Sequence, residues 1–372
     1  MYDVALTGTG VFTPPHTITN DELVKAFNAY VNLFNAEHAD EIAAGKVEAK
    51  QHSSSAFIVA ASGIEQRYVL DKEGILDPTR MYPNLPAYAD DEPGQMARIG
   101  VDACEKALAM AGLRGEDVDL VLCAASNMER AYPAVAVEIQ QLLGAGGFAF
   151  DMNVACSSAT FGIQTAADMI RSGSVRTAIV VNPEICSAHL EWRDRDCHFI
   201  FGDVATATVL QRADDATGDA FKVLSTRCAT QFSNNIRNNN GFLRRARDQM
   251  DDRRDMQFMQ NGRKVFKEVL PLVSQHIAAH MADEGIGADD LRRLWLHQAN
   301  KTMNDYIGKK VLGRDPAEGE QPNILQDYAN TSSAGSIIAF AQHRDGLAPG
   351  DLGVICSFGA GYSVGSVILQ KI

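Results

Sequence analysis

The chain has 372 residues, of which 46% are hydrophobic and 22% are charged, so it can bury one large core or two fused halves. Its formal net charge of -13 argues against a nucleic-acid-binding role, because phosphate binding needs a surplus of Lys and Arg. No apolar run reaches the length of a membrane span, and the first residues lack the basic start of a signal peptide, so we expect a cytoplasmic protein.

The seven cysteines are an odd number at wide spacings, and they include no C-x-x-C pair. This pattern indicates neither a disulfide framework nor a zinc site. We expect no metal site and interpret most cysteines as small core residues.

The first elements are predicted from local pattern. Residues 4–15 predict a short buried strand that Gly and Pro end. A helix should follow with Thr19 or Asn20 as its N-cap, and its apolar positions predict an amphipathic helix packed on the body. These positions are Leu23, Phe27, Tyr30 and Phe34. Residues 70–94 contain four prolines and predict a long ordered loop or lid without a helix.

From residue 95 onward, helical and strand-like runs alternate, which is typical of an α/β fold with buried parallel strands. Residues 112–127 align without gaps on residues 285–300, an offset of 173, and residues 151–158 align on 327–334, an offset of 176. Either match alone could be chance. Because both occur in the same order, they favour a duplicated α/β half, with one half at residues 1–212 and the other at 213–372.

A candidate nucleophile stands where one predicted strand turns into a helix. The strand-like run leads to Cys156, and small residues then open the helix. A sulfur near a helix N-terminus is expected to favour the thiolate, the nucleophilic form. The alternative is one more buried cysteine, but the bend and the small neighbours favour a catalytic role.

Two polar residues are predicted to reach the same crevice. His297 directly follows an apolar strand, and the carboxyl ends of strands are where open α/β sheets build sites. Asn330 lies two residues before Ser332, which the repeat pairs with Cys156. The alternatives are a hydrogen-bonded core histidine and an ordinary turn asparagine.

The C-terminal residues 357–369 place glycines between two strand-like runs. Gly359 and Gly361 permit close backbone approach, and the N–H groups nearby can stabilise a thioester oxyanion. A plain glycine hairpin is the alternative.

These motifs together resemble β-ketoacyl-acyl-carrier-protein synthase III, a condensing enzyme of the thiolase superfamily. The likeness extends over nearly the whole chain, and its ordered combination of motifs is highly specific. The motifs are S-G-I-E-Q-R (62–67), R-A-Y-P-A-V-A (130–136), D-M-N-V-A-C (151–156), I-F-G-D (200–203), N-G-R-K-V-F-K (261–267), H-Q-A-N (297–300) and A-N-T-S-S-A (329–334).

The resemblance implies a duplicated, five-layered α-β-α-β-α thiolase-like fold, a homodimer and a ping-pong reaction. The acyl group of a thioester such as acyl-CoA moves to Cys156; malonyl-acyl-carrier-protein then loses carbon dioxide, and its carbanion attacks the acyl-enzyme. His297 and Asn330 are implied to hold the enolate oxygen, as two neutral hydrogen-bond donors suit this charge. No metal or redox cofactor is implied.

The resemblance also implies that acidic acyl carrier protein docks on a basic surface. Lys267, Lys309 and Lys310 match basic positions of that surface in the family. An Arg-rich stretch at 237–254 either adds to this surface or is a solvated loop balanced by aspartates, and the second interpretation is favoured.

Departures from the family pattern bear on the substrate. The Trp/Arg pair that sandwiches the adenine of coenzyme A is replaced by Phe57 and Ala61. Ala159 stands where the family often has a bulky aromatic, so we predict a medium-chain acyl donor, each extra buried methylene contributing roughly 0.8 kcal/mol. Tyr132, at the family's position for the end of the neighbouring subunit's acyl pocket, opposes this by its size.

Three other functions compete. The main alternative is a specialised condensing enzyme that makes a signalling lipid, an alkylresorcinol or another secondary metabolite. A thiolase is disfavoured because its second cysteine falls at Ser357, with Cys356 one position away. A silent acyl-binding subunit would be expected to lose Cys156, His297 or Asn330, and all three are present.

Overall fold

The computed structural model describes residues 1–238 and 253–372. Within them, nine strands form one hydrogen-bonded order, β11-β12-β13-β8-β1-β7-β6-β4-β5. The first half supplies β1 (Val4–Phe12), β4 (Leu120–Ala124), β5 (Phe148–Met152), β6 (Thr177–Ile185) and β7 (Asp203–Arg212). The second half supplies β8 (Phe221–Ser233), β11 (Leu291–Leu296), β12 (Leu352–Gly359) and β13 (Gly361–Lys371). Since β7 ends at Arg212, we propose the division of the halves there.

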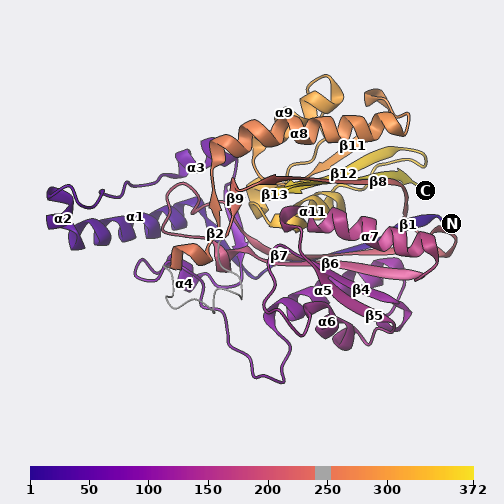
Figure 1. Ribbon diagram of the computed structural model, residues 1–372, viewed down its shortest axis with the longest axis horizontal. Coiled ribbons are helices and arrows are strands. Elements are labelled where there is room, and N and C mark those ends of the chain that lie inside the picture. The colour runs from indigo at the N-terminus through magenta and orange to yellow at the C-terminus, as the bar shows by residue number, and fades with distance from the viewer. Residues whose placement is uncertain (239–252) are drawn as a thin grey trace.

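Among the strands that the structure describes, the two groups pair with one another only between β1 and β8, through Ala5 with Lys222 and Leu6 with Phe221. Elsewhere they lie in two separate layers (Figure 1). The expected parallel pairing occurs between β4 and β5, β4 and β6, and β11 and β12. The remaining pairs of this sheet are antiparallel. The sheet is therefore mixed, because hairpin-like returns such as β12 to β13 place antiparallel strands beside the parallel ones.

Three helical layers alternate with the two strand layers (Figure 1). α5 (Gln95–Ala111) and α6 (Val135–Leu143) cover one outer face, and α8 (Gly262–Asp283) and α9 (Lys301–Leu312) cover the other. α7 (Ser158–Ser172) and α11 (Gly335–Gln342) lie between the strand layers. The predicted five-layered α-β-α-β-α thiolase-like fold is confirmed.

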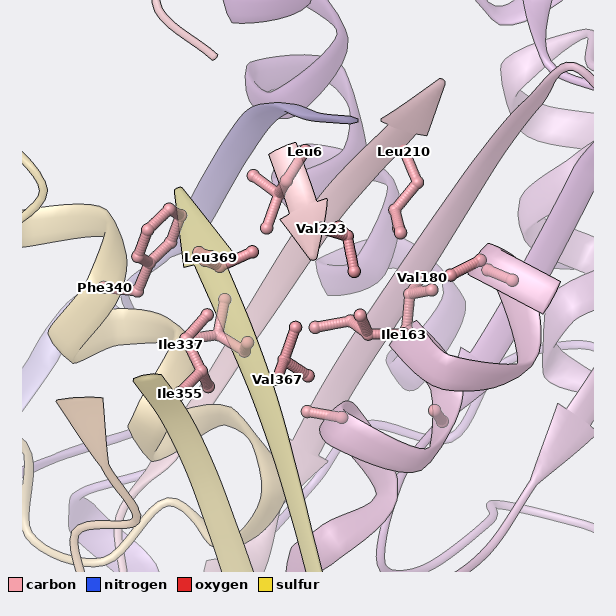
Figure 2. Packing of buried hydrophobic residues seen from close by; sticks show 14 of the residues in the cluster. Leu6, Ile163, Val180, Leu210, Val223, Ile337, Phe340, Ile355, Val367 and Leu369 are labelled. Carbon is pink, nitrogen blue, oxygen red and sulfur yellow. The ribbon is translucent and has the colours of Figure 1, made fainter. Parts of the chain in front are cut away.

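The central core explains why the two middle helices are apolar. Figure 2 shows Ile163 of α7 and Ile337 of α11 packed among Val180 of β6 and Val367 of β13, all fully or almost fully buried. Because both middle helices are covered by sheet, the burial of their side chains holds the halves together. The carboxyl end of β5 and the amino end of α7 are fixed by this packing.

A separate group of elements packs beside the layers. It contains α1 (Asn20–Glu37), α2 (Ala39–Ala43), α3 (Ser55–Ser62), α4 (Glu73–Leu76), α10 (Leu325–Tyr328) and the small pairs β2 (His16–Thr19) with β3 (Gln66–Val69) and β9 (Ile236–Arg237) with β10 (Met259–Gln260). The predicted helix at α1 is confirmed, with Thr19 and Glu22 forming a capping box. The expectation of no helix at 70–94 is wrong for α4, whose first turn is held by the Asp71 carboxylate accepting from the Gly74 N–H at 3.1 Å.

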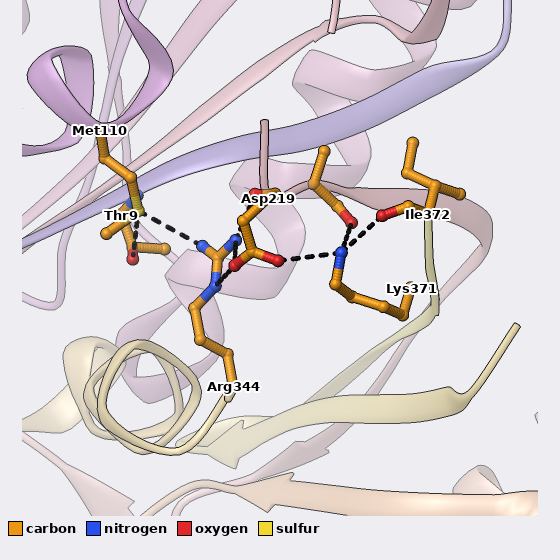
Figure 3. A network of polar contacts seen from close by, with 7 residues as sticks. Thr9, Met110, Asp219, Arg344, Lys371 and Ile372 are labelled. Carbon is orange, nitrogen blue, oxygen red and sulfur yellow. Dashed lines mark hydrogen bonds and ion pairs between the residues drawn. The ribbon is translucent and has the colours of Figure 1, made fainter. Parts of the chain in front are cut away.

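A polar cluster also joins the two halves (Figure 3). The Arg344 guanidinium, which is 3% exposed, donates to the Asp219 carboxylate at 2.7 Å, and Lys371 pairs with the same carboxylate at 2.9 Å. Arg344 also donates to the sulfur of Met110 in α5 at 3.4 Å. The buried charge is thus paired and hydrogen-bonded, as buried charges must be to persist.

Candidate active site

One cavity of about 800 Å³ opens between the second-half strands and the elements beside the layers, a size typical of ligand pockets. Cys156, His297 and Asn330 all line it. The sequence placed these three residues in one crevice, and in the structure they share one cavity. Much of the rest of the lining is apolar, including Phe201, Ile236, Phe258, Val265 and Val269.

Cys156 lies on the turn between β5 and α7, within the short 3-10 helix η2 (Ala155–Ser157). The side chain of Asn153 shapes this turn, because its Oδ1 accepts from the backbone N–H of Ala155 at 3.0 Å. Ala155 has a φ of 47°, in the left-handed region that few non-glycine residues adopt. The sharp bend directs the chain so that the following residue, Cys156, lines the cavity.

The thiol of Cys156 is held in its protonated form. Protein atoms crowd the sulfur, and this desolvation raises the pKa of Cys156 to about 11, although the Ser332 hydroxyl, 3.4 Å from Sγ, acts to lower it. The backbone groups of Ala360 and of Cys156 itself also lower the pKa. This desolvation works against the effect of the helix N-terminus, which is expected to favour the thiolate.

His297 is the first residue after β11, and its backbone N–H continues the strand pairing by donating to Cys356 O at 2.8 Å. Burial lowers the pKa of His297 to about 4, so the imidazole is neutral near pH 7. Its ring packs edge-on against Phe358 with centroids 5.1 Å apart. A neutral, oriented imidazole can donate one hydrogen bond to a ligand and accept another.

Asn330 is fixed by its own turn. Its Oδ1 accepts from the Ser332 N–H at 2.8 Å, and its backbone bridges to Phe201 through the neighbouring residues Ile200 and Gly202. With Oδ1 engaged, the amide NH2 is the group of Asn330 available to the cavity it lines. Asn330 can therefore act as a hydrogen-bond donor.

The structure corrects the second repeat by one residue. Asn153 and Asn330 make the same turn, Ala155 and Ser332 both have positive φ, and η2 corresponds to η8 (Ser332–Ala334). The offset is thus 332 - 155 = 177 and not 176. The sequence alignment matched Asp151 with Asp327 because the two residues are identical. This match placed the repeat one residue away from the register in which the two turns correspond. The partner of Cys156 is Ser333.

The glycine-rich end packs directly on the nucleophile. A Cβ added at Gly359 would lie 2.6 Å from Cys156 Cβ and 3.0 Å from Sγ, so only glycine fits. Gly361 begins β13 with a φ of 132°, and it is not among the cavity-lining residues in the described part of the chain. Ala360, between them, is the residue whose backbone faces the sulfur, and the sequence analysis missed it.

Of the three side chains expected to bind substrate, only one lines the cavity. Phe57 lines the cavity from α3. Ala159 lies in the buried core between the sheets and does not line the cavity, so the volume left by its small side chain is not cavity volume. Tyr132 is 84% exposed on the loop before α6, away from the cavity lining of this chain.

Arg195 is a second residue that the sequence analysis missed. Its guanidinium lies 4.2 Å from the centroid of the Phe57 ring, and Phe57 also meets Phe199 edge-on. Phe57 thus has a cation beside it that comes from 138 positions along the chain, 195 - 57, and not from position 61, where Ala61 stands. No local motif could indicate this contact.

The three lysines are exposed on the outer helices. Lys267 lies on α8, while Lys309 and Lys310 lie on α9. Lys309 pairs with Asp315 at 3.0 Å, and Lys310 lies 5.6 Å from the ring centroid of Tyr306. Most of the Arg-rich stretch, at 239–252, lies outside the described residues.

Residues 150–231 match the family model described as 3-oxoacyl-[acyl-carrier-protein] synthase III, and residues 281–371 match the model of its C-terminal part. The chain is 54% identical over 349 residues to a β-ketodecanoyl-[acyl-carrier-protein] synthase of Pseudomonas aeruginosa, covering 94% of this chain and 100% of that one. It is 32% identical to a β-ketoacyl-[acyl-carrier-protein] synthase III of Mesorhizobium japonicum, covering 87% and 93%.

This chain belongs to the 3-oxoacyl-acyl-carrier-protein synthase III family. The synthase III crystal structure from Aquifex aeolicus shares the fold with a TM-score of 0.76 at 24% identity, covering 99% of both chains. The chain is accordingly a condensing acyltransferase of the thiolase superfamily, acting in fatty acid synthesis. The specialised lipid pathways kept as the alternative are not favoured by these relatives.

Two further observations concern membrane-spanning helices and metal sites. In residues 1–238 and 253–372, no helix is both long and apolar enough to cross a lipid bilayer. The same residues contain no cluster of three or more His, Cys, Asp or Glu side chains arranged to hold a metal ion.

Proposed function

We propose that this enzyme condenses an octanoyl thioester with malonyl-acyl-carrier-protein to give 3-oxodecanoyl-acyl-carrier-protein. The observation that carries the proposal is the 54% identity to the β-ketodecanoyl synthase over that protein's full length. A decanoyl product is two carbons longer than its donor, because malonate contributes two carbons after losing carbon dioxide. The apolar lining formed by Ile236, Val265 and Val269 supports a medium-chain donor.

In the first half-reaction, the sulfur of Cys156 attacks the donor's carbonyl carbon. A bond from Sγ to that carbon forms, the donor's own carbon–sulfur bond breaks, and the proton of the Cys156 thiol ends on the released thiol. The backbone N–H groups of Cys156 and Ala360 face the sulfur and stabilise the oxyanion of the tetrahedral intermediate.

In the second half-reaction, the malonyl carboxylate leaves as carbon dioxide and its electron pair forms an enolate. His297 and Asn330 donate hydrogen bonds to the enolate oxygen. The carbanion then attacks the acyl-enzyme carbonyl, and the Cys156 sulfur leaves and regains a proton from solvent. Neither half-reaction changes the electron count, so we propose that no redox cofactor takes part.

The partners follow from the surface around the cavity. The stacked pair of Phe57 and Arg195 offers an aromatic face and a cation for the adenine and phosphates of acyl-CoA. Lys267, Lys309 and Lys310 provide local positive charge for the acidic acyl carrier protein. We also propose a homodimer in which the exposed Tyr132 reaches the partner subunit's acyl pocket, and a cytoplasmic location.

A panel of acyl thioesters from acetyl to dodecanoyl, assayed with malonyl-carrier-protein, tests the donor. We expect kcat/KM to peak at octanoyl, with 3-oxodecanoyl-carrier-protein as the product identified by mass spectrometry. The Cys156→Ala variant is the blank. A higher kcat/KM for acetyl than for octanoyl thioester would refute the medium-chain donor.

A further inference from the structure

Glu184 is a buried carboxylate that the reaction scheme does not use. It lies in β6, is 2% exposed and is not among the cavity-lining residues in the described part of the chain. Ser126 donates to it from its backbone N–H at 2.9 Å and from Oγ at 2.5 Å. Ser333 does the same, at 3.2 Å and 2.5 Å. One carboxylate thus binds two segments, one from each half of the chain.

One segment is hydrogen-bonded to the Cys156 turn, and the other contains the Asn330 turn. Ser126 O accepts from Asn153 Nδ2 at 2.9 Å, and Asn153 shapes the turn that presents Cys156. Ser333 directly follows Ser332, whose N–H is bound by Asn330 and whose Oγ lies 3.4 Å from the sulfur of Cys156. Glu184 therefore stands where the two related turns meet.

We infer that Glu184 is a positioning residue that fixes the Cys156 turn and the Asn330 turn relative to one another. It makes four hydrogen bonds at this junction, and only a group that accepts on both oxygens can satisfy four donors from two segments. The inference rests on the proposed roles of Cys156 and Asn330. Its effect is on geometry and on charge, without contact to substrate.

The charge of Glu184 also acts on the nucleophile. Burial raises the pKa of Glu184 to about 7, although the hydrogen bonds from Ser126 and Ser333 lower it. The ionised carboxylate raises the pKa of Cys156, and it acts in the same direction on the buried thiols of Cys123 and Cys186. Loss of the charge should therefore lower the pKa of Cys156 even while it loosens the turns.

Asp203 offers a matched control. It is a second fully buried carboxylate, with its pKa raised to about 6 by burial, and it accepts from the N–H and Oγ of Ser187 at 2.8 and 2.7 Å. Its third donor is the Leu70 N–H at 3.0 Å. Neither partner belongs to the Cys156 or Asn330 turn, but Asp203 directly follows Gly202, whose N–H donates to Asn330 O at 3.1 Å. Asp203 therefore controls for the stability cost of losing a buried carboxylate and for the charge effect on Cys156, and not for kcat.

The test compares Glu184→Gln, Glu184→Asp and Asp203→Asn. Cys156 reactivity is followed as the pH dependence of iodoacetamide alkylation, and condensation as kcat per folded enzyme at saturating substrates. In Glu184→Gln we expect the alkylation midpoint to move to lower pH and kcat to fall about tenfold or more, because the amide NH2 faces serine donors. Asp203→Asn should keep the wild-type midpoint, whatever it does to melting temperature, because Glu184 and not Asp203 acts on the pKa of Cys156.

Glu184→Asp keeps the charge and shortens the reach by one methylene. It should keep the midpoint near that of wild type while kcat falls, and it serves in place of Glu184→Gln if that variant does not fold. Unchanged midpoint and kcat in Glu184→Gln, or unchanged kcat in Glu184→Asp, would overturn the inference. Alkylation of Cys156 needs no acyl substrate, so failure of the proposed reaction in wild-type enzyme is distinguished from failure of the positioning role.

Discussion

The Cys156 turn and the Asn330 turn share one backbone design and offer different side chains to the cavity. In each, an asparagine side chain accepts from the N–H two residues on, and a non-glycine residue adopts positive φ: Ala155 at 47° and Ser332 at 51°. Each then passes through a 3-10 helix into a middle helix, α7 or α11. The fold therefore brings two equivalent turns to one cavity, and each turn lines the cavity with a different one of its positions.

What differs is the side chain that each turn offers. The first turn lines the cavity with the thiol of Cys156. The Asn153 side chain of this turn donates to Ser126 O and has a structural role. The second turn lines the cavity with Asn330 itself, and its Ser333 hydroxyl is bound to Glu184. The same backbone geometry thus occurs twice, and we propose that the first turn provides covalent chemistry and the second stabilises charge.

Removing the thiol should have the largest effect. Cys156→Ala should abolish acyl-enzyme formation, because no other group on the first turn can form the thioester. Intact-protein mass after incubation with octanoyl thioester measures it. Cys356→Ala is the control: this buried cysteine stands nearest the thiolase position, and its loss should leave acylation intact. Acylation of Cys156→Ala would assign the nucleophile to another residue.

Crowding the first turn should have the next largest effect. Gly359→Ala places a methyl group 2.6 Å from Cys156 Cβ, so the turn or the glycine-rich strand must shift. We expect about 1–3 kcal/mol of strain and a fall in the acylation rate of about five- to 150-fold. Gly146→Ala is the matched control, because the nearest atom to the added methyl group would be 4.0 Å away and the φ of Gly146 is not positive. Equal rates in both variants would contradict the close packing on the sulfur.

Changing the docking surface should act on only one substrate. Lys267→Glu with Lys310→Glu should raise KM for malonyl-carrier-protein several-fold and weaken its salt dependence, because both lysines are exposed and screened. KM for octanoyl-CoA should stay constant. Lys46→Glu is the control, because Lys46 is an exposed lysine just after α2 and its replacement makes the same change of charge per site away from the three lysines. A KM for the carrier protein that does not change would exclude this surface.

Weakening the scaffold far from the turns should leave the chemistry unchanged. Arg344→Met removes the buried guanidinium shown in Figure 3 and its hydrogen bonds to Asp219. We expect the free energy of unfolding to fall by about 1–3 kcal/mol, typical of hydrogen bonds to charged groups, with kcat per folded enzyme unchanged. Urea denaturation and active-site titration measure the two quantities. A lower kcat without lost stability would show coupling between this cluster and the site.

Local features were predictable from the sequence. The strand at β1, the capped helix at α1 and the turn at Cys156 follow from periodicity and from capping residues that act over a few positions. The glycine-rich end was also evident, and in the structure Gly359 lies against the sulfur as a close-approach glycine should.

Features set by distant packing were not predictable. The pKa of Cys156 depends on how many atoms surround the sulfur, and the sequence shows only the helix that follows it. Ala159 faces the inter-sheet core because of the direction in which α7 leaves its turn. Glu184 stands in a mostly apolar strand with no motif around it, and its partners lie 58 and 149 positions away.

The division of labour between the turns is tested most directly in Asn330→Ala, by comparing the burst of Cys156 acylation with carbon dioxide release from malonyl-carrier-protein. The account predicts a burst close to that of wild type. It also predicts that carbon dioxide release falls about 10²–10³-fold, as expected for loss of one donor aimed at a developing oxyanion. Carbon dioxide release at the wild-type rate, or loss of the burst, would contradict it.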